Sequence, residues 1–289
     1  MEAKKSMFGS LKLASLSKFL KQLRKVDNLF RTSIFENKHF EDPDGLLPLS
    51  VKQMQRLKEW ARPIDHIPSS QYVNGMPDIA TQVNGYEVMQ KTVGDCSVLS
   101  SLAVAAHFEM KQNWAKRIIT HNIFPQDING NPIYNPTGEY IVKLFVNGTW
   151  RGVKIDDFFP MSTNGNWLGA YSARGKLWVN LIEKAYLKLN GGYAFWGSNS
   201  SRDLYVLTGW LPEKHDLKES DFDRNSLWER IKAGYRNNDC LITIGTISVI
   251  PDEEAIGLVG NHAYGVLEIQ EVLGHRLLLV KNPWGHFSW

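Results

Sequence analysis

The sequence predicts an α+β fold built in two halves, a helical half followed by a mainly β half. Apolar residues recur at helical spacing from Cys96 onward and again over 178–189, which indicates two buried helices. Beyond Gly209 the apolar runs become short, as is typical of strands: 240–246, 262–269 and 276–280. The 289 residues, 43% of them hydrophobic, are enough for one large or two ordinary domains. We therefore predict one half at 46–208 and the other at 209–289.

Residues 1–45 are predicted to form a basic extension or linker ahead of the first half. Within 1–30, seven basic residues stand against two acidic ones, and apolar residues recur at helical spacing between them. This pattern predicts an amphipathic helix, which packs on its own domain, links to another segment, or touches a partner or an anionic membrane surface. Peripheral membrane contact through 1–30 is therefore one expectation.

The elements inside the two halves follow from turns and periodicity. In chain order they are a helix at 50–61 ended by Pro63, an irregular arm at 63–85, a helix from 96 to about 112, a hairpin at 140–156, a helix at 178–189 and a helix at 226–233. The hairpin prediction depends on Asn147-Gly148, a strong turn pair between alternating apolar segments. Gly191-Gly192 ends the helix that precedes it.

Composition excludes several classes of protein. The only cysteines are Cys96 and Cys240, so there is no disulfide framework, and without a signal peptide we expect a reducing, cytoplasmic compartment. No apolar run approaches the roughly 18–20 residues of a membrane span. A net charge of +3 is too weak to indicate nucleic-acid binding. The histidines lack paired metal-ligand spacing, so no metal site is predicted.

Cys96 is the candidate nucleophile. A polar, glycine-containing stretch ends at Asp95, a favoured N-cap residue type, and small apolar residues begin at Cys96. A cysteine at a helix N-terminus experiences roughly half a positive charge, which favours the thiolate. The alternative is that Cys96 is a small core residue, which is the role predicted for Cys240 in its apolar strand.

A distant histidine and asparagine complete the candidate site. Cysteine, then His262, then Asn282 is the chain order of papain-type thiol proteases. His262 is predicted to take the thiol proton and return it to the leaving amine, and Asn282 to orient the imidazole. Gln90 is the predicted side-chain donor to the oxyanion, beside the backbone N–H of Cys96. The cleft then lies between the two halves, whose closure is a natural control point.

Several motifs in this order resemble the catalytic core of the calpain family of cysteine proteases. They are Gln90, Gly94-Asp95-Cys96, His262-Ala263-Tyr264 and Lys281-Asn282-Pro283-Trp284-Gly285, and the similarity runs from about Leu46 to the end. Asp95-Cys96-Ser97 and Gly197-Ser198-Asn199-Ser200 resemble the PalB-type, calpain-seven-like branch. The resemblance implies a papain-like fold, with Gly94 in the cleft and Trp284 as the indole that shields the His–Asn hydrogen bond. A plain core tryptophan is the alternative for Trp284.

The same resemblance argues against calcium activation of the usual kind. Ser97 and Gly85 stand where calcium-activated calpains have a cleft tryptophan and an interdomain arginine, and Glu87 falls alone at the position of an acidic calcium ligand. We therefore predict that no cofactor is required, although calcium stays an open alternative. The acidic residues 252–254 are predicted to form a solvated loop, with calcium binding as the alternative. By comparison with calpains the chain ends inside a motif, so we expect a truncated second half.

The predicted function is a calpain-like cysteine endopeptidase that performs limited proteolysis of a regulatory protein. The PalB-type resemblance implies endosomal sorting components as partners, an endosome-associated location within the cytoplasm, and a role in endosomal sorting or ambient-pH signalling. Two alternatives stay open. One is an inert calpain-like scaffold, and the other is a transglutaminase-like acyl transferase, against which Asn282 argues because those enzymes normally use aspartate.

Overall fold

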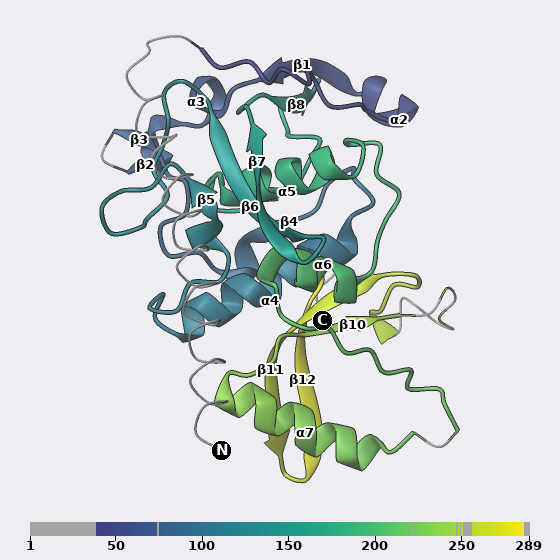
Figure 1. Cartoon of the computed structure of the whole chain (residues 1–289). Helices are drawn as coiled ribbons and strands as arrows, with labels where there is room; N and C mark the ends of the chain where they lie inside the picture. Colours follow the sequence, from purple (N-terminus) through teal and green to yellow (C-terminus); the bar gives the residue numbers. More distant parts are fainter. Residues whose placement is uncertain are drawn as a thin grey trace, which may run out of the picture.

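The computed structural model describes residues 39–285 apart from 74, 221, 247, 249 and 251–255. The amphipathic helix predicted at 1–30 and the acidic loop predicted at 252–254 lie outside the described residues. The protein combines helices with several small sheets (Figure 1), which confirms the predicted α+β class. In the described part of the chain, no helix is both long and apolar enough to cross a membrane.

Helix α4 (Cys96–Lys111) is the central helix of the fold, and Cys96 is its first residue. Every residue from Ser97 to Glu109 is buried, as expected for a helix that is covered on all sides. Its neighbours include η2 (Gly85–Glu87), α6 (Ser200–Thr208) and β11 (Ala263–Val272). The predicted start and approximate end of this helix are therefore confirmed.

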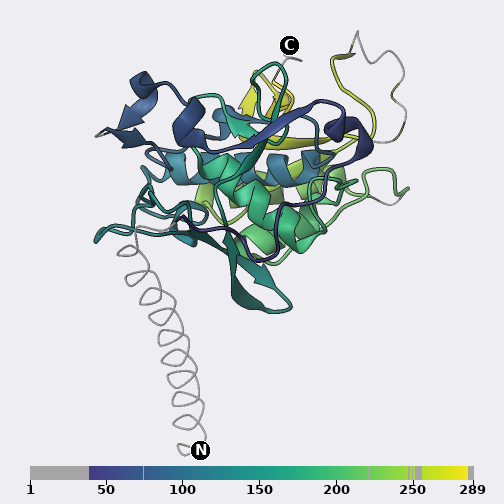
Figure 2. The same ribbon diagram turned by 90° about the horizontal axis from the view of Figure 1, so that it is seen from above.

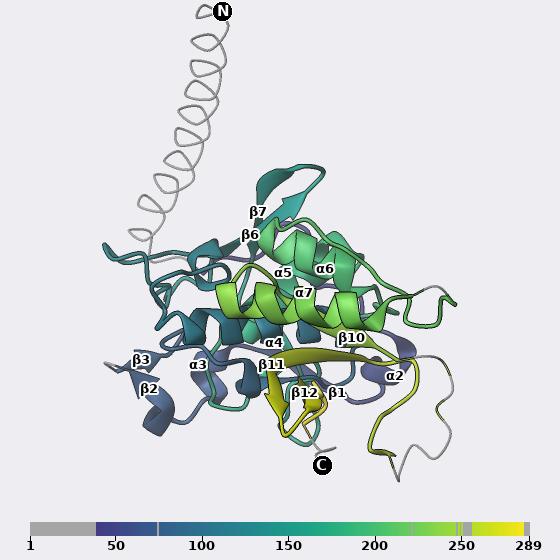
Figure 3. The ribbon, with the colours of Figure 1, turned by 90° about the horizontal axis from the view of Figure 1, so that it is seen from below.

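A three-stranded sheet and α5 (Trp178–Leu189) build much of the first half. The strands β6 (Tyr140–Val146) and β7 (Thr149–Ile155) pair antiparallel in continuous register, and β5 (Ile123–Phe124) adds to β6. Asn147 and Gly148 both have positive φ, 52° and 73°, as the two central residues of a tight hairpin turn require. This hairpin projects from the body of the molecule in Figures 2 and 3.

The segment before α4 differs from its prediction. The helix predicted at 50–61 is confirmed only as the single turn α2 (Val51–Met54), because β1 (Leu57–Ala61) instead pairs antiparallel with β8 (Phe159–Ser162). A strand partner about a hundred residues away overrides the weak helical pattern. The predicted irregular arm contains only short elements: α3 (Pro63–His66), η1 (Ser69–Gln71), β2 (Tyr72–Val73) and β3 (Met76–Pro77), followed further on by β4 (Val88–Met89), η3 (Thr120–Asn122) and β9 (Tyr171–Ser172).

The second half is a three-stranded sheet covered by one helix. The sheet runs in the order β10 (Ile242–Gly245), β11, β12 (His275–Lys281), all antiparallel. Helix α7 (Arg224–Asn237) extends beyond its predicted range and packs against β11, crossing the strands at an angle (Figure 1). A small apolar cluster joins them through Trp228, Val266 and Ile269. The three predicted strands are confirmed, whereas α6 was not predicted.

Candidate active site

The histidine and asparagine of the candidate site are in direct contact. His262 Nε2 lies 2.9 Å from Asn282 Oδ1, and both side chains are buried. The same Asn282 oxygen accepts the backbone N–H of Trp284 at 3.0 Å. Because a carbonyl oxygen can only accept, Nε2 must carry the imidazole proton in the neutral ring, which leaves Nδ1 free to accept a proton. Strand β12 ends one residue before Asn282 and so fixes this geometry.

The imidazole is also held from its backbone and covered on its face. Thr246 Oγ1 accepts the His262 N–H at 2.9 Å, which ties the start of β11 to the end of β10. The Trp284 ring lies 4.5 Å from the His262 ring, centroid to centroid, at an angle of 49°. Burial lowers the pKa of His262, and the hydrogen bond to Asn282 opposes that effect. Trp284 is thus placed to shield the His–Asn hydrogen bond.

Cys96 stands at the point where α4 meets the first residues of β11. The Ser100 hydroxyl donates to Ala263 O at 2.8 Å, and the backbone N–H of Ala263, the residue after His262, faces the Cys96 thiol. Burial raises the pKa of this thiol, and the Ala263 N–H lowers it by less. The direction is opposite to the lowered pKa expected for a thiol at a helix N-terminus, because burial disfavours the thiolate and the nearby Asp95 carboxyl adds to this effect.

Gln90 is close to the site but turned toward its own loop. Its side-chain Nε2 donates to Val93 O at 2.8 Å, and its backbone N–H donates to Pro283 O at 2.9 Å. The second bond joins the loop before Cys96 to the turn that carries Asn282. An amide nitrogen has two N–H groups: one donates to Val93 O, and the Gln90 side chain also lies against the Asp95 carboxyl group, whose pKa it lowers.

Gly94 packs against a segment that the sequence prediction missed. A Cβ at Gly94 would lie 3.3 Å from Phe195 O, and Gly197, with φ of +125°, approaches Gly94 O. Between them Trp196 is 93% exposed. An aromatic pair followed by a glycine was the sequence signal that could have indicated this wall of the site.

A buried acidic pair behind Cys96 was also missed. Asp95 precedes the helix but does not cap it; its carboxyl group is fully buried and faces Glu183 of α5. Burial raises the pKa of Asp95 to about 7 and raises that of Glu183 well above its usual range. Glu183 Oε1 accepts the backbone N–H of Ala170 at 2.7 Å. Two carboxyl groups that favour their protonated forms thus lie next to the start of the Cys96 helix.

Comparison with known proteins decides the family. The sequence model of the family described as "calpain family cysteine protease" matches residues 35–289 of this chain. The chain belongs to the calpain family of cysteine proteases. Calpain-7 of Mus musculus is 41% identical over 254 residues, which are 86% of this chain and 30% of that protein. Calpain-7 of Homo sapiens is 42% identical over 254 residues, which again are 86% of this chain and 30% of that protein. Calpain-like protease palB/cpr-8 of Neurospora crassa is 37% identical over 243 residues, 82% of this chain and 25% of that protein.

These similarities confirm the predicted resemblance, including its PalB-type branch, and with it the papain-like fold. The chain spans about a third or less of the length of the curated relatives it matches. Activity, substrates and partners of the whole relatives are therefore only proposals for this chain.

The position of the expected acidic calcium ligand is occupied by protein groups. Glu87 Oε1 accepts the Trp178 indole N–H at 2.7 Å, and Glu87 Oε2 lies 3.3 Å from Lys176 Nζ. The same ammonium donates to Gln82 O at 2.9 Å. A divalent cation needs several oxygen ligands with negative charge, and here the single carboxylate is already neutralised. Among the described residues no group of three or more His, Cys, Asp or Glu side chains is placed to hold a metal ion.

Gly85, at the position of the interdomain arginine in calcium-activated calpains, has a steric reason to be glycine. A Cβ there would lie 2.3 Å from Ala103 O of α4. This contact is far shorter than van der Waals separation, so no side chain is accommodated at that position in this packing. Cys240 is half-buried on the second half, and its Sγ lies 2.9 Å from the position of a Cβ on Gly234.

Proposed function

We propose that this chain is the catalytic core of a cysteine endopeptidase that performs limited cleavage of a regulatory protein. The observation that carries the proposal is the His262–Asn282 hydrogen bond, covered by Trp284 and placed beside the N-terminus of the Cys96 helix. This is the arrangement that thiol-protease chemistry needs, with a nucleophile, a base and a group that orients the base.

The chemistry follows from the imidazole tautomer. Nδ1 of His262 takes the thiol proton as Cys96 Sγ attacks the scissile carbonyl, and Asn282 stabilises the imidazolium through Nε2–H. The oxyanion accepts the backbone N–H of Cys96 and a side-chain N–H of Gln90. The amine then leaves with the proton from Nδ1, which gives a thioester on Cys96. Water, deprotonated by His262, hydrolyses the thioester and restores the thiol.

The test is cleavage of an unfolded protein substrate by the full chain and by two matched variants. Cys96→Ala removes the nucleophile and should abolish cleavage, whereas Cys240→Ala should retain it. Unchanged thermal unfolding of both variants shows that the fold is intact. Cleavage that survives Cys96→Ala contradicts the proposal, and a wild-type chain that cleaves nothing favours the inert scaffold. Ammonia release from a glutamine peptide would instead favour acyl transfer.

The cellular setting is proposed from the relatives. The similarity to palB-type proteins and calpain-7 supports an endosome-associated cytoplasmic location, endosomal sorting components as partners, and a role in ambient-pH signalling or endosomal sorting. Residues 1–30 are the proposed membrane contact. We also propose that the core needs no calcium, because Lys176 already supplies a positive charge beside Glu87.

A further inference from the structure

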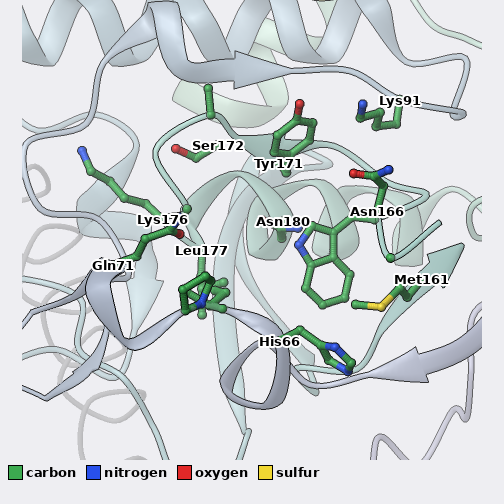
Figure 4. Close-up of a pocket in the computed structure, with 16 residues that line it drawn as sticks. His66, Gln71, Lys91, Met161, Asn166, Tyr171, Ser172, Lys176, Leu177 and Asn180 are labelled. Carbon is green, nitrogen blue, oxygen red and sulfur yellow. The ribbon is translucent and has the colours of Figure 1, made fainter.

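A pocket of about 330 Å³ opens beside Lys91, the residue that follows Gln90. Its volume is at the lower end of the size range for ligand sites. Its walls come from η1, β8, β9 and the start of α5. Figure 4 shows Asn180 near its centre, with Lys91 and Tyr171 at one edge. We call it the Asn180 pocket. Neither the catalytic residues nor Trp284 line it.

Asn180 is the first indication that the pocket is built for a ligand. Its side chain lies on α5, the residue is only 3% exposed, and it lines the pocket. The amide makes no hydrogen bond to any residue in the described part of the chain. The Asn180 amide atoms are not among the fully enclosed unpaired atoms of the described residues, so they are open to the pocket, where a polar ligand group can hydrogen-bond to them.

The electrostatics of the pocket select the sign of that ligand. Lys91 lies at the rim, with its Nζ 5.1 Å from the centroid of the Tyr171 ring. It makes no ion pair with any carboxylate of the described residues. No carboxylate of the described residues lines the pocket. Next to it, Lys176 and Arg174 share the single carboxylate of Glu87. The residues that line the pocket therefore carry a net positive charge, from Lys91 and Lys176.

Other amides add hydrogen-bond donors. Gln71 and Asn166 line the pocket together with Asn180 (Figure 4). Gly175 has φ of +72° and no side chain, which lets the Gln71 amide approach its backbone. A Cβ on Gly175 would lie 1.8 Å from Gln71 Oε1, well inside contact distance. Amide N–H groups together with one free ammonium suit a carboxylate, which accepts up to about four hydrogen bonds and gains from the charge.

The route to the pocket identifies the source of the carboxylate. Lys91 directly follows Gln90, and Met89 of β4 pairs with Tyr171 of β9. Strand β9, which forms part of the pocket wall, is thus paired with β4, the strand that ends directly before Gln90. We expect a polypeptide that extends from the catalytic residues past Gln90 to meet Lys91 next, at the rim of the pocket.

We propose that the Asn180 pocket binds an acidic side chain of the protein substrate, with Lys91 pairing the carboxylate and the Asn180 amide donating to it. This proposal rests on the proposed peptidase function, because it assigns the occupant to the substrate. It gives the cleavage site a preference for aspartate or glutamate on the side of the scissile bond that Lys91 borders.

Binding is tested without catalysis, on the full chain carrying Cys96→Ala. The probes are two fluorescein-labelled ten-residue peptides, in which glycine alternates either with glutamate or with glutamine. The glutamate peptide should bind about tenfold tighter, the affinity equivalent of one charge-assisted hydrogen bond. Lys91→Gln should remove this difference, and Asn180→Leu should reduce it. Lys214→Gln, on the exposed loop between α6 and α7, is the matched control and should retain it.

The possible results distinguish a specific pocket from a general attraction of anions. Equal affinities for the two peptides, or a difference that survives Lys91→Gln, overturn the proposal. Equal losses in Lys91→Gln and Lys214→Gln show a general charge effect and also overturn it. Displacement of the glutamate peptide by low millimolar inorganic phosphate identifies a small-anion site and overturns the assignment to substrate. Because binding is read on Cys96→Ala, failure of the chain to cleave peptides overturns only the proposed function.

A second readout uses the active chain. When a mixed peptide library is cleaved, acidic residues should be enriched at one position on the leaving side of the scissile bond. Lys91→Glu should exchange this preference for lysine and arginine at the same position. An unchanged profile in Lys91→Glu contradicts the assignment of the pocket.

Discussion

At the scale of single residues, the site depends on one hydrogen-bonded chain of atoms. The Trp284 N–H fixes the oxygen of Asn282, the oxygen fixes the proton on His262 Nε2, and that proton leaves Nδ1 free to act as a base. The Cys96 thiol has a raised pKa because of burial. We therefore expect its reactivity to depend on proton transfer to His262.

The dependence of Cys96 on His262 is measurable by alkylation. Iodoacetamide labelling of Cys96 at neutral pH should fall by about tenfold or more in His262→Ala, because the general base is lost. Cys240 in the same molecule is the internal control and should label at an unchanged rate. The readout is mass spectrometry of the two cysteine peptides. An equal rate for Cys96 in both proteins would mean that the thiol and imidazole do not cooperate.

The orienting role of Asn282 gives a second prediction. Asn282→Ala removes the acceptor for Nε2–H, so the ring is free to rotate and to adopt the other tautomer. We expect kcat to fall by about tenfold to a thousandfold, with KM little changed, since Asn282 does not reach the substrate. Kinetics on any peptide that the wild type cleaves provide the measurement, and a loss confined to KM would contradict this role.

At the scale of elements, the approach of η2 to α4 depends on a position without a side chain. Gly85→Ala would place a Cβ 2.3 Å from Ala103 O. We expect the free energy of unfolding to fall by about 1–3 kcal/mol or more through overpacking. Gly245→Ala is the matched control, since nothing lies within 4 Å of its Cβ position. Urea unfolding measures both, and equal effects would mean that the η2 contact can relax.

The ammonium of Lys176 gives a prediction at the same scale. Lys176→Met leaves the Glu87 carboxylate buried without its nearest cation, and breaking such a pair costs about 3–5 kcal/mol. The double variant Lys176→Met, Glu87→Gln should recover most of this stability, because it removes the buried charge that only the exposed Arg174 would still face, at 3.9 Å. Thermal unfolding with calcium and with chelator should give the same midpoint for the wild type. A rise of several degrees with calcium would contradict the proposed calcium independence.

At the scale of the whole molecule, the buried carboxyl groups beside Cys96 link stability to pH. The pKa of Asp95 rises to about 7 in the folded protein from an ordinary value of 3.8. Between these values the folded state holds a proton that the unfolded state has lost, so stability decreases as pH rises from about 4 to about 7. Burial and the nearby Asp95 carboxyl raise the pKa of Glu183 in the same direction, whereas the hydrogen bond with Glu183 lowers that of Asp95 by less than burial raises it.

Replacing the acid with its amide tests this linkage. Asp95→Asn should flatten the loss of stability between about pH 4 and 7 and leave the protein more stable at about pH 8 than the wild type. Asp216→Asn, at an exposed loop position, should leave the pH dependence unchanged. Urea unfolding across this pH range measures both. A wild-type stability that rises over the same range would contradict the assignment.

The linear sequence alone identified the catalytic candidates and most long elements. Cys96 at a helix start, the Asn147-Gly148 hairpin and the strands around His262 and Asn282 all follow from local periodicity and turn chemistry, which act over a few residues. The family motifs are likewise short runs of neighbouring residues. These features survive in the structure because local and tertiary preferences agree there.

Only the tertiary structure decided the features that depend on distant partners. Residues 57–61 became a strand because β8 pairs with them, and the Glu87 carboxylate is paired with Lys176, which is distant in the sequence. The thiol pKa of Cys96 reflects burial where α4 meets β11 rather than the dipole of its own helix. Burial and contact between residues far apart in sequence set these energies, and no local pattern encodes them.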